Sequence, residues 1–431
     1  METSRQQNNA TSQSDFEQIG TAANEVAASD DLIDEITWPA VAILVSGFFA
    51  NFIVFGIGFS YGVFQEFYLS PKGPLYGQKQ SQVAMIGTLA TSLTYCGGIF
   101  QNFIRNHYST RLSMSCGTLM LALGMILAGS CTQVWQFSLT QGVMFGIGSS
   151  TCYLPPVIYG PQYFKRWRGT ANGIIFSGTG FGALSFAFLT RYLLTAIGWR
   201  WTLRTLGLIS LIVVGTCSQF VTPHPDYVAH SDSLVLNMSV IRSRKFLLQI
   251  LAAGFQSLAY LIPLTYMSSY GITLGFTENQ GATFIGINNA INAVAKIAVG
   301  RAADHVGRVN MLAICCLSST VVVFALWLVP QRETFTTFVV LYGVTSGPII
   351  SLLPATLVET FGISLYHSVS GLLYFSRGVG NALGSPIAGL LVGTSAERPS
   401  NYRSVIIYTG TALAMASLLV VSFRLSVNKR H

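Results

Sequence analysis

The sequence predicts an all-helical membrane protein with twelve transmembrane helices in two pseudo-symmetric bundles of six. The first observation is composition: of 431 residues, 51% are hydrophobic and 9% are charged, whereas soluble domains carry about 25% charged residues. The second is a series of twelve apolar stretches near the length of about 20 residues that crosses a bilayer. The third is a glycine pattern that recurs in the fifth stretch of each half, which indicates a duplicated unit.

The twelve predicted spans follow one another from Trp38 onward. Spans 1 and 11 are long and are interrupted by Gly or Pro, so we expect bends in them. Span 4 ends at Pro155 and Pro156, which a membrane helix tolerates where neighbours or a cavity satisfy the freed carbonyl groups. The approximate cores of the spans are 40–66, 82–103, 112–131, 137–160, 170–194, 201–221, 246–270, 280–301, 309–329, 335–358, 366–394 and 404–424.

Polar segments separate these spans into two halves. Residues 1–37 are polar and lack the apolar core of a signal peptide, so we expect a disordered cytoplasmic tail. Residues 38–221 would form the N-terminal six-helix bundle and 246–425 the C-terminal one. A cytoplasmic connector at 222–245 would join them, and 426–431 would form a short cytoplasmic tail.

The distribution of basic residues predicts the topology. With both termini in the cytoplasm, the inner loops hold roughly twice as many Lys and Arg as the outer loops. We therefore expect a multi-pass protein of the plasma membrane, with an internal membrane such as that of the vacuole as the alternative. The lipid bilayer is then its main partner, nucleic acid is not, and we expect a monomer. The seven cysteines show no metal spacing, so we expect no disulfide, metal or cofactor.

The glycine repeat lies in two stretches about two hundred residues apart, GIIFSGTGFG and GLLYFSRGVG. Thr179 in the first copy corresponds to Arg377 in the second, so only the second copy carries a charge. A charge inside a membrane span is costly and commonly functional. The matched glycines are Gly173, Gly180 and Gly182 in the first copy and Gly371, Gly378 and Gly380 in the second.

A charged loop motif, GRAADHVGR, lies between spans 8 and 9. Asp304 can cap a helix N-terminus or pair with Arg301 or Arg308, and Gly300 allows two helices to approach closely. The motif, which ends in Gly307 and Arg308, resembles the loop signature of the major facilitator superfamily, whose members are transporters with this twelve-helix fold. The alternative is a solvated turn whose charges only set topology.

The equivalent loop of the first half, GGIFQNFIRNHYSTR, departs from that signature. Asn102 and Ser109 stand where the signature has glycine, and Asn106 stands where it has aspartate. Only Arg111 is kept. We therefore expect the loop of the first half to hold the cytoplasmic helix ends together less strongly than the loop of the second half.

Further stretches resemble the monocarboxylate-transporter-like branch of that superfamily, and its fungal members most closely. These are SYGVFQEFY, YFKRWRGTANGIIFSGTGFG, GWRWTLRTLGLI and FSRGVGNALGSPIAGLL. Acid–proton cotransporters of the branch carry a lysine in span 1 and an Asp and Arg one turn apart in span 8. Here Phe59 stands at the first position, and Asn292 and Lys296 stand at the pair, while Trp167 interrupts the basic run before span 5. The missing carboxylate argues against proton-coupled transport of lactate.

Charged and polar residues inside the spans are the candidate substrate-binding or gating residues. Lys296, Asn292 and Asn289 form one polar stripe of span 8, although Lys296 could instead snorkel to the interface. Arg377, with Asn381 one turn on, would have a cavity or gating role or form a structural pair with Glu359. Arg204 more simply ties span 6 to its neighbours or the interface. The remaining candidates are Phe59, Tyr61 and Thr179.

These features predict a secondary transporter that moves a small organic solute, monocarboxylate-like or another metabolite, by alternating access. An exporter of a secondary metabolite is the alternative, and a transporter-like nutrient sensor is a third. No nucleophile elbow, phosphate-binding loop or metal-binding helix appears in the sequence, so we do not expect an enzyme.

Overall fold

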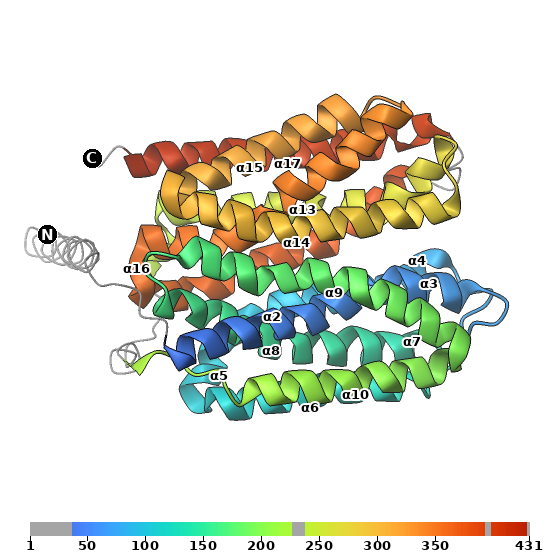
Figure 1. Cartoon of the computed structure of the whole chain (residues 1–431), viewed down its shortest axis with the longest axis horizontal. Coiled ribbons are helices and arrows are strands. Elements are labelled where there is room, and N and C mark those ends of the chain that lie inside the picture. The colour runs from blue at the N-terminus through green and yellow to red at the C-terminus, as the bar shows by residue number, and fades with distance from the viewer. Residues whose placement is uncertain (1–36, 226–237, 393–397, 429–431) are drawn as a thin grey trace, which may run out of the picture.

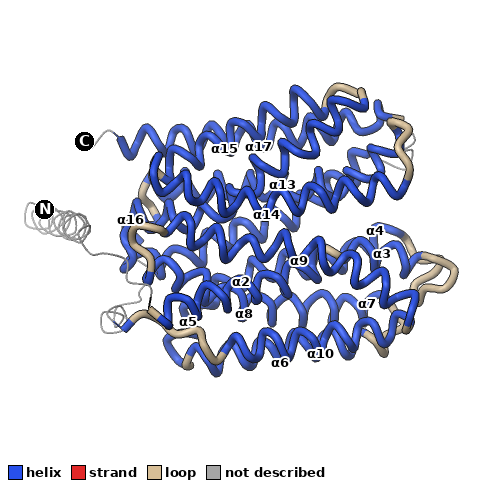
Figure 2. Tube along the Cα trace, viewed as in Figure 1, coloured by secondary structure: helices blue, strands red, loops and turns tan. Residues whose placement is uncertain are grey.

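The computed structural model describes residues 37–225, 238–392 and 398–428, and within these ranges it consists of helices and turns without a strand (Figure 2). The predicted N-terminal tail and the middle of the predicted connector lie outside the described residues. Of the described part, ten helices are long and apolar enough to cross a membrane. The segments 134–163 and 363–392 are helical as well, which brings the helical spans to the predicted twelve.

The N-terminal half contains six helical spans, and several of them are assembled from more than one helix. They are α2 (Trp38–Phe59) with α3 (Tyr61–Leu69), α4 (Gln80–Cys96) with η1 (Gly97–Phe100) and α5 (Gln101–His107), α6 (Thr110–Ala128), α7 (Val134–Phe137) with η2 (Ser138–Met144) and α8 (Phe145–Tyr163), α9 (Arg168–Ala196), and α10 (Gly198–Ser218).

The C-terminal half repeats this arrangement after the short α12 (Met238–Ile241). Its spans are α13 (Arg244–Thr273), α14 (Glu278–Val306), α15 (Arg308–Val322) with η4 (Val323–Trp327), the two parts of α16 (Arg332–Val392), and η5 (Pro399–Tyr402) with α17 (Arg403–Asn428). Gly362 divides α16 into spans 10 and 11, because its φ of 76° and ψ of 165° are not helical. A φ in this range strains a residue with a side chain, so glycine is suited to the turn.

The predicted bend in span 1 is present: Ser60, with φ −80° and ψ 0°, separates α2 from α3. In span 11, residues 363–392 continue as helix through Pro386, and the non-helical backbone at Gly362 lies before the span.

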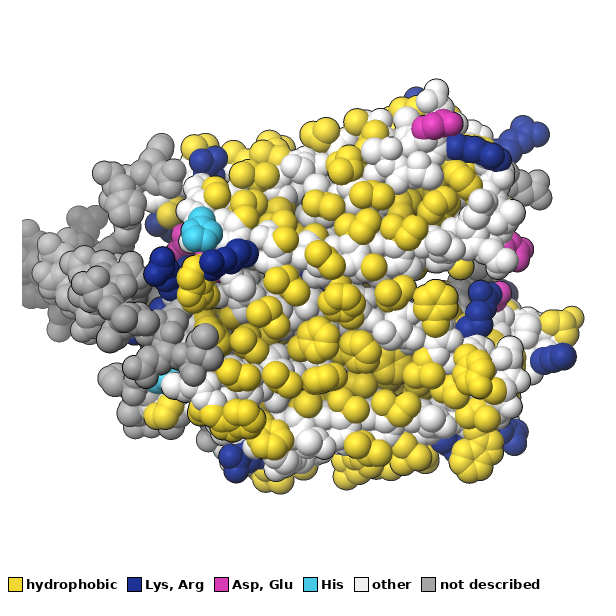
Figure 3. Space-filling model, in the orientation of Figure 1, with side chains coloured by type: hydrophobic (Ala, Val, Ile, Leu, Met, Phe, Trp, Pro, Cys, Tyr) yellow, Lys and Arg dark blue, Asp and Glu magenta, His cyan; other side chains and the backbone are white. Residues whose placement is uncertain are grey.

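The two halves lie side by side as two helical bundles (Figure 1). The described chain begins near Trp38 and ends near Asn428 at the same end of the molecule, which we call the terminal face (Figure 1). The opposite end is the distal face. Figure 3 shows hydrophobic side chains spread over the middle of one long side, with Lys and Arg gathered toward the two ends. This distribution suits a bilayer around the middle and water at both faces.

The matched glycines of the repeat make matched contacts between the halves. A β-carbon on Gly173 of α9 would collide with the carbonyl oxygen of Lys296 on α14. At the equivalent position of α16, a β-carbon on Gly371 would lie 2.6 Å from the carbonyl oxygen of Gly98, next to α4. The repeat therefore marks two backbone-to-backbone seams, α9 with α14 and α16 with α4.

A second pair of matched glycines makes close contacts between helices of the same half. A β-carbon on Gly182 would collide with the Phe52 carbonyl oxygen of α2, and one on Gly380 would collide with the Gly254 carbonyl oxygen of α13. Spans 5 and 11 are thus each packed closely on two sides. Their side chains at the intervening positions, which include Thr179 and Arg377, are held at the boundary between the halves.

Candidate functional site

The terminal end of the α9–α14 seam is closed by the charged loop motif. Asp304, on the last turns of α14, accepts hydrogen bonds from the backbone N–H groups of Gly169 and Thr170, both at 2.8 Å, and from the Thr170 hydroxyl at 2.8 Å. These two residues form the first turn of α9, whose unpaired N–H groups favour a carboxylate. Because the Asp304 side chain is fully buried, these bonds form away from water.

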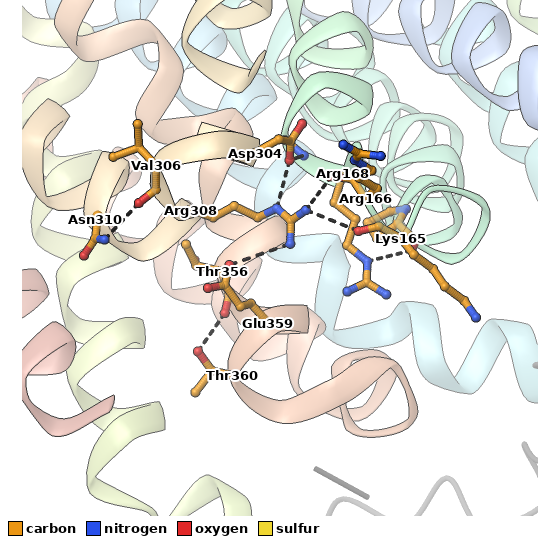
Figure 4. Close-up of polar contacts among 12 residues, drawn as sticks. Lys165, Arg166, Arg168, Asp304, Val306, Arg308, Asn310, Thr356, Glu359 and Thr360 are labelled. Carbon is orange, nitrogen blue, oxygen red and sulfur yellow. Dashed lines mark hydrogen bonds and ion pairs between the residues drawn. The ribbon is translucent and has the colours of Figure 1, made fainter. Parts of the chain in front are cut away.

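Arg308, which begins α15, ties the same carboxylate to the loop before α9 (Figure 4). Its Nε donates to Asp304 Oδ1 at 3.0 Å, and its Nη2 donates to the carbonyl oxygens of Lys165 and Arg166 at 3.2 and 2.9 Å. Gly307 makes the turn between the two helices with a φ of 96°, a conformation that suits glycine. Asp304 therefore both caps a helix and pairs with Arg308, two of the three contacts that the sequence offered as alternatives.

Arg301 does not pair with Asp304 but stacks on an aromatic ring of the other half. Its Cζ lies 3.6 Å from the centre of the Trp167 ring, and the His305 ring lies 5.7 Å from the same ring. Trp167 directly precedes α9, so this cation–π contact is a second interaction that holds α9 and α14 together. Sequence reasoning missed this role, although the tryptophan in an otherwise basic run was its signal.

Glu359 belongs to this terminal cluster and not to the middle of the membrane. Its Oε2 lies 3.7 Å from Arg308 Nη1 (Figure 4). The structural pair between Glu359 and Arg377, which the sequence offered as the alternative to a cavity or gating role, is therefore not formed. Arg377 lies more than four helical turns beyond Glu359 along α16, and the turn at Gly362 intervenes.

Near the middle of the α9–α14 seam, Lys296 donates a hydrogen bond to the hydroxyl of Thr179. Thr179 in turn donates to the carbonyl oxygen of Phe176 at 2.8 Å. Lys296 is 1% exposed, so it does not snorkel to the interface as the sequence alternative allowed. The contact joins the two halves through a charged side chain and a hydroxyl.

Arg377 is also 1% exposed and contacts side chains of both halves. Its Nη1 donates to Gln256 Oε1 of α13 at 2.7 Å, and its Cζ lies 5.2 Å from the centre of the Tyr95 ring of α4. Gln256 and Tyr95 were not predicted; the signal for Gln256 was a polar residue in an apolar span.

Tyrosine rings from both halves surround Arg377. Tyr153 of α8 makes edge contacts with Tyr95 and Tyr374, at centroid distances of 6.2 and 6.1 Å, and with Phe55 at 5.0 Å. These rings come from α2, α4, α8 and α16, so they enclose the boundary between the bundles. Sequence reasoning did not single out Tyr95, Tyr153 or Phe55 as part of this cluster.

The polar stripe of α14 lies beside this cluster. Asn292 Nδ2 contacts the Tyr260 hydroxyl at 3.4 Å, and Asn292 is 1% exposed. Asn289 is 6% exposed, and its carbonyl oxygen lies 2.5 Å from the position of a β-carbon on Gly180. Arg377 is close enough to Lys296 and to Tyr260 to interact with both electrostatically, and the two cations repel each other.

The other candidates lie outside this central group. Asn381 donates to the hydroxyls of Thr91 and Ser92, at 2.8 and 3.2 Å, and so holds the α16–α4 seam. The Tyr61 hydroxyl donates to the Val83 carbonyl oxygen at 2.6 Å within the N-terminal half. The Phe59 ring neighbours the ring of Phe55, with 5.5 Å between the two centroids.

Arg204 has the tying role that its sequence predicts. Its Nη2 donates to Ser130 Oγ at 3.3 Å, and its Cζ lies 5.0 Å from the centre of the Trp201 ring. It therefore lies away from the boundary between the halves.

Comparison with known proteins places this architecture in a family. The model of the Major Facilitator Superfamily matches residues 41–385 and 293–430. The chain is 28% identical to the MFS-type transporter pynF of Aspergillus niger over 361 residues, 83% of this chain and 82% of that protein. It is 24% identical to the agnestins efflux protein AgnL12 of Paecilomyces divaricatus over 393 residues, 91% of this chain and 89% of that protein.

Solved structures agree on the fold. A double tryptophan mutant of XylE superposes with a TM-score of 0.70 at 14% identity, covering 89% of this chain and 94% of XylE. The outward conformation of FucP superposes with a TM-score of 0.67 at 13% identity, covering 89% of this chain and 98% of FucP. With helical spans in two halves, a closed charged seam and the family model matched along nearly its whole length, the chain belongs to the major facilitator superfamily and is a multi-pass membrane transporter.

Proposed function

We propose that this transporter exports an organic secondary metabolite by alternating access, and that the terminal face is cytoplasmic. The observation that carries the proposal is the buried Arg377, which is ringed by tyrosines of both halves at the boundary where a substrate would bind. The likeness to a protein named for efflux, along 91% of this chain, favours the outward direction.

The finer assignment to the monocarboxylate-transporter-like branch remains a proposal that rests on the sequence resemblance. Its usual activity, uptake of a monocarboxylate with a proton, is the second candidate. It is disfavoured because Lys296 contacts Thr179, and no described carboxylate stands beside it to carry the proton. Efflux of a larger, ring-bearing metabolite fits the aromatic surroundings of Arg377 better.

In the proposed cycle, the seam between α9 and α14 works as the inner gate. The structure has this seam closed by Asp304, Arg308 and Trp167, so it represents the state in which the cytoplasmic route is shut. Substrate would enter from the cytoplasm when the Asp304 bonds break and would bind beside Arg377. Closure of the seam would then expose the site to the distal face. We propose the plasma membrane as the location.

Transport into sealed membrane vesicles of both orientations tests this proposal. Vesicles that contain the chain would be compared with vesicles that lack it, using radiolabelled lactate and a panel of radiolabelled aromatic fungal metabolites. We expect inside-out vesicles to accumulate at least one aromatic metabolite and not lactate. Uptake of lactate into right-side-out vesicles, without transport of any aromatic compound, would overturn export in favour of the second candidate.

A further inference from the structure

The guanidinium group of Arg377 is only partly hydrogen-bonded. Nη1 donates to Gln256 Oε1 at 2.7 Å, but Nε and Nη2 are buried and have no hydrogen-bond partner among the described residues. The amide nitrogen of Gln256 is also buried without a partner in the described part of the chain. A buried donor that is left unpaired destabilises the structure, because it loses its hydrogen bonds to water and gains none in return. These donors therefore point to a missing acceptor.

Two tyrosine hydroxyls belong to the same group. Those of Tyr153 and Tyr374 are buried and have no hydrogen-bond partner within the described ranges. Both tyrosines interact electrostatically with Arg377. The unpaired groups are therefore two guanidinium nitrogens, an amide nitrogen and two hydroxyls, all on side chains that interact with Arg377 or belong to it. A ligand with acceptor oxygens would satisfy them, whereas a ligand rich in N–H groups would not.

The charges around this place are unbalanced. Lys296 and Arg377 are each 1% exposed. The acidic side chains of the described residues are all elsewhere: Glu66 pairs with Arg191 near the surface, Asp304 and Glu359 contact Arg308, and Glu278 and Glu333 are exposed. Buried charges without a counter-charge are strongly unfavourable. A negatively charged ligand would supply that counter-charge.

We propose that the exported metabolite is an aromatic organic anion, whose carboxylate or ionised phenol binds the free edge of Arg377 while its ring packs among the tyrosines. Lys296, on α14 of the same half and at its boundary with α9, would meet a second acceptor of the same ligand. Gln256 is a positioning residue, because it holds the guanidinium through Nη1 and leaves Nε and Nη2 for the ligand. This inference rests on the proposed function, since it names the chemical class that the same site exports.

Binding to the purified full chain in lipid nanodiscs tests the inference without requiring transport. The probe is 2-naphthoate, and the matched uncharged probe is 2-naphthamide, which has the same ring system. We expect the wild type to bind naphthoate at least tenfold more tightly than naphthamide, because a charged hydrogen bond contributes about 1.5–3 kcal/mol.

Gln256→Glu is the sharpest variant, because it keeps the shape of the side chain and places a carboxylate beside Arg377. We expect it to remove the preference for naphthoate while naphthamide still binds, a result that a merely structural role would not produce. Arg377→Gln should weaken naphthoate binding roughly tenfold or more. Arg204→Gln, a change of the arginine that contacts Ser130, is the control and should leave both affinities unchanged.

Equal binding of the two probes, binding of neither, or an unchanged preference in Gln256→Glu would overturn the inference. Failure of export is separable from these results. If naphthoate binds with the expected dependence on Arg377 but vesicles accumulate no metabolite, the anion site stands and the export proposal fails. If an aromatic metabolite is exported equally well by Arg377→Gln, export stands and the anion site fails.

Discussion

A β-carbon on Gly169 of α9 would stand 2.5 Å from the carbonyl oxygen of Gly300 on α14, so the two halves meet at this point backbone to backbone. The contact lies directly beside Asp304, which bonds to the Gly169 N–H. The close approach and the carboxylate cap therefore depend on each other. Any side chain at position 169 separates the carboxylate from the helix end that it caps.

Gly169→Ala should consequently hinder closure of the seam. Inserting a methyl group into a tight contact costs about 1–3 kcal/mol, enough to shift the ratio of closed to open states roughly fivefold or more. We expect transport to fall strongly while the amount of protein in the membrane is unchanged. Gly215→Ala is the matched control, because its added β-carbon would meet only Thr118, at 3.9 Å. Equal transport by the two variants would contradict the role of the seam.

Asp304→Asn should release the same seam by removing charge and not volume. The buried carboxylate accepts three hydrogen bonds from Gly169 and Thr170 and one from Arg308, so its neutralisation costs about 2–3 kcal/mol or more. We expect a larger loss of transport than in Glu278→Gln, which changes an exposed acid on the same helix. Flux into vesicles is measured for both variants, and similar flux would count against the role of Asp304 in closing the seam.

Trp167→Ala tests the cation–π contact between Trp167 and Arg301. Loss of the stacking contact with Arg301 should cost about 0.5–2 kcal/mol, less than the loss of Asp304. Trp167→Phe keeps an aromatic face and should retain most of the transport. Flux of the two variants in the same vesicle preparation is the measurement. Alanine and phenylalanine variants of equal activity would show that the ring does not matter.

Lys296→Met should separate stability from function. Methionine has a similar length but no charge, so it removes the desolvation penalty of several kcal/mol that a buried ion without a counter-charge carries. We expect thermal unfolding of the purified variant at the same or a higher temperature, with transport lost. A variant that unfolds more readily, or that transports normally, would remove Lys296 from the site.

Much of the fold could be predicted because the bilayer imposes it. Apolar stretches of the required length became helical spans, and the glycine repeat marked close contacts at Gly173 and Gly371. The break expected between spans 10 and 11, after residue 358 and before residue 366, falls at Gly362, because glycine adopts the positive φ that this tight turn needs.

The site could be predicted only in part, because partners distant in sequence are not visible in a pattern. Lys296 and Arg377 were identifiable as charges inside apolar spans, but their actual partners, Thr179 and Gln256, lie about 120 residues away in each case. Tyr95 and Tyr153 could not be distinguished from ordinary packing aromatics, since only the assembled halves bring their rings to Arg377.

The central claim is that Asp304 holds the terminal face closed and that release of this seam gives access to the Arg377 site. Double electron–electron resonance, which measures the distance between two spin labels across the terminal face, tests it most directly. The labels are attached at Arg111→Cys on α6 and Arg424→Cys on α17, two positions that are exposed. Cys116, the exposed native thiol, is first replaced by serine. The account predicts mainly one short distance in the otherwise unchanged protein and an added population at longer distance in Asp304→Asn. Identical distance distributions in the two proteins would contradict it.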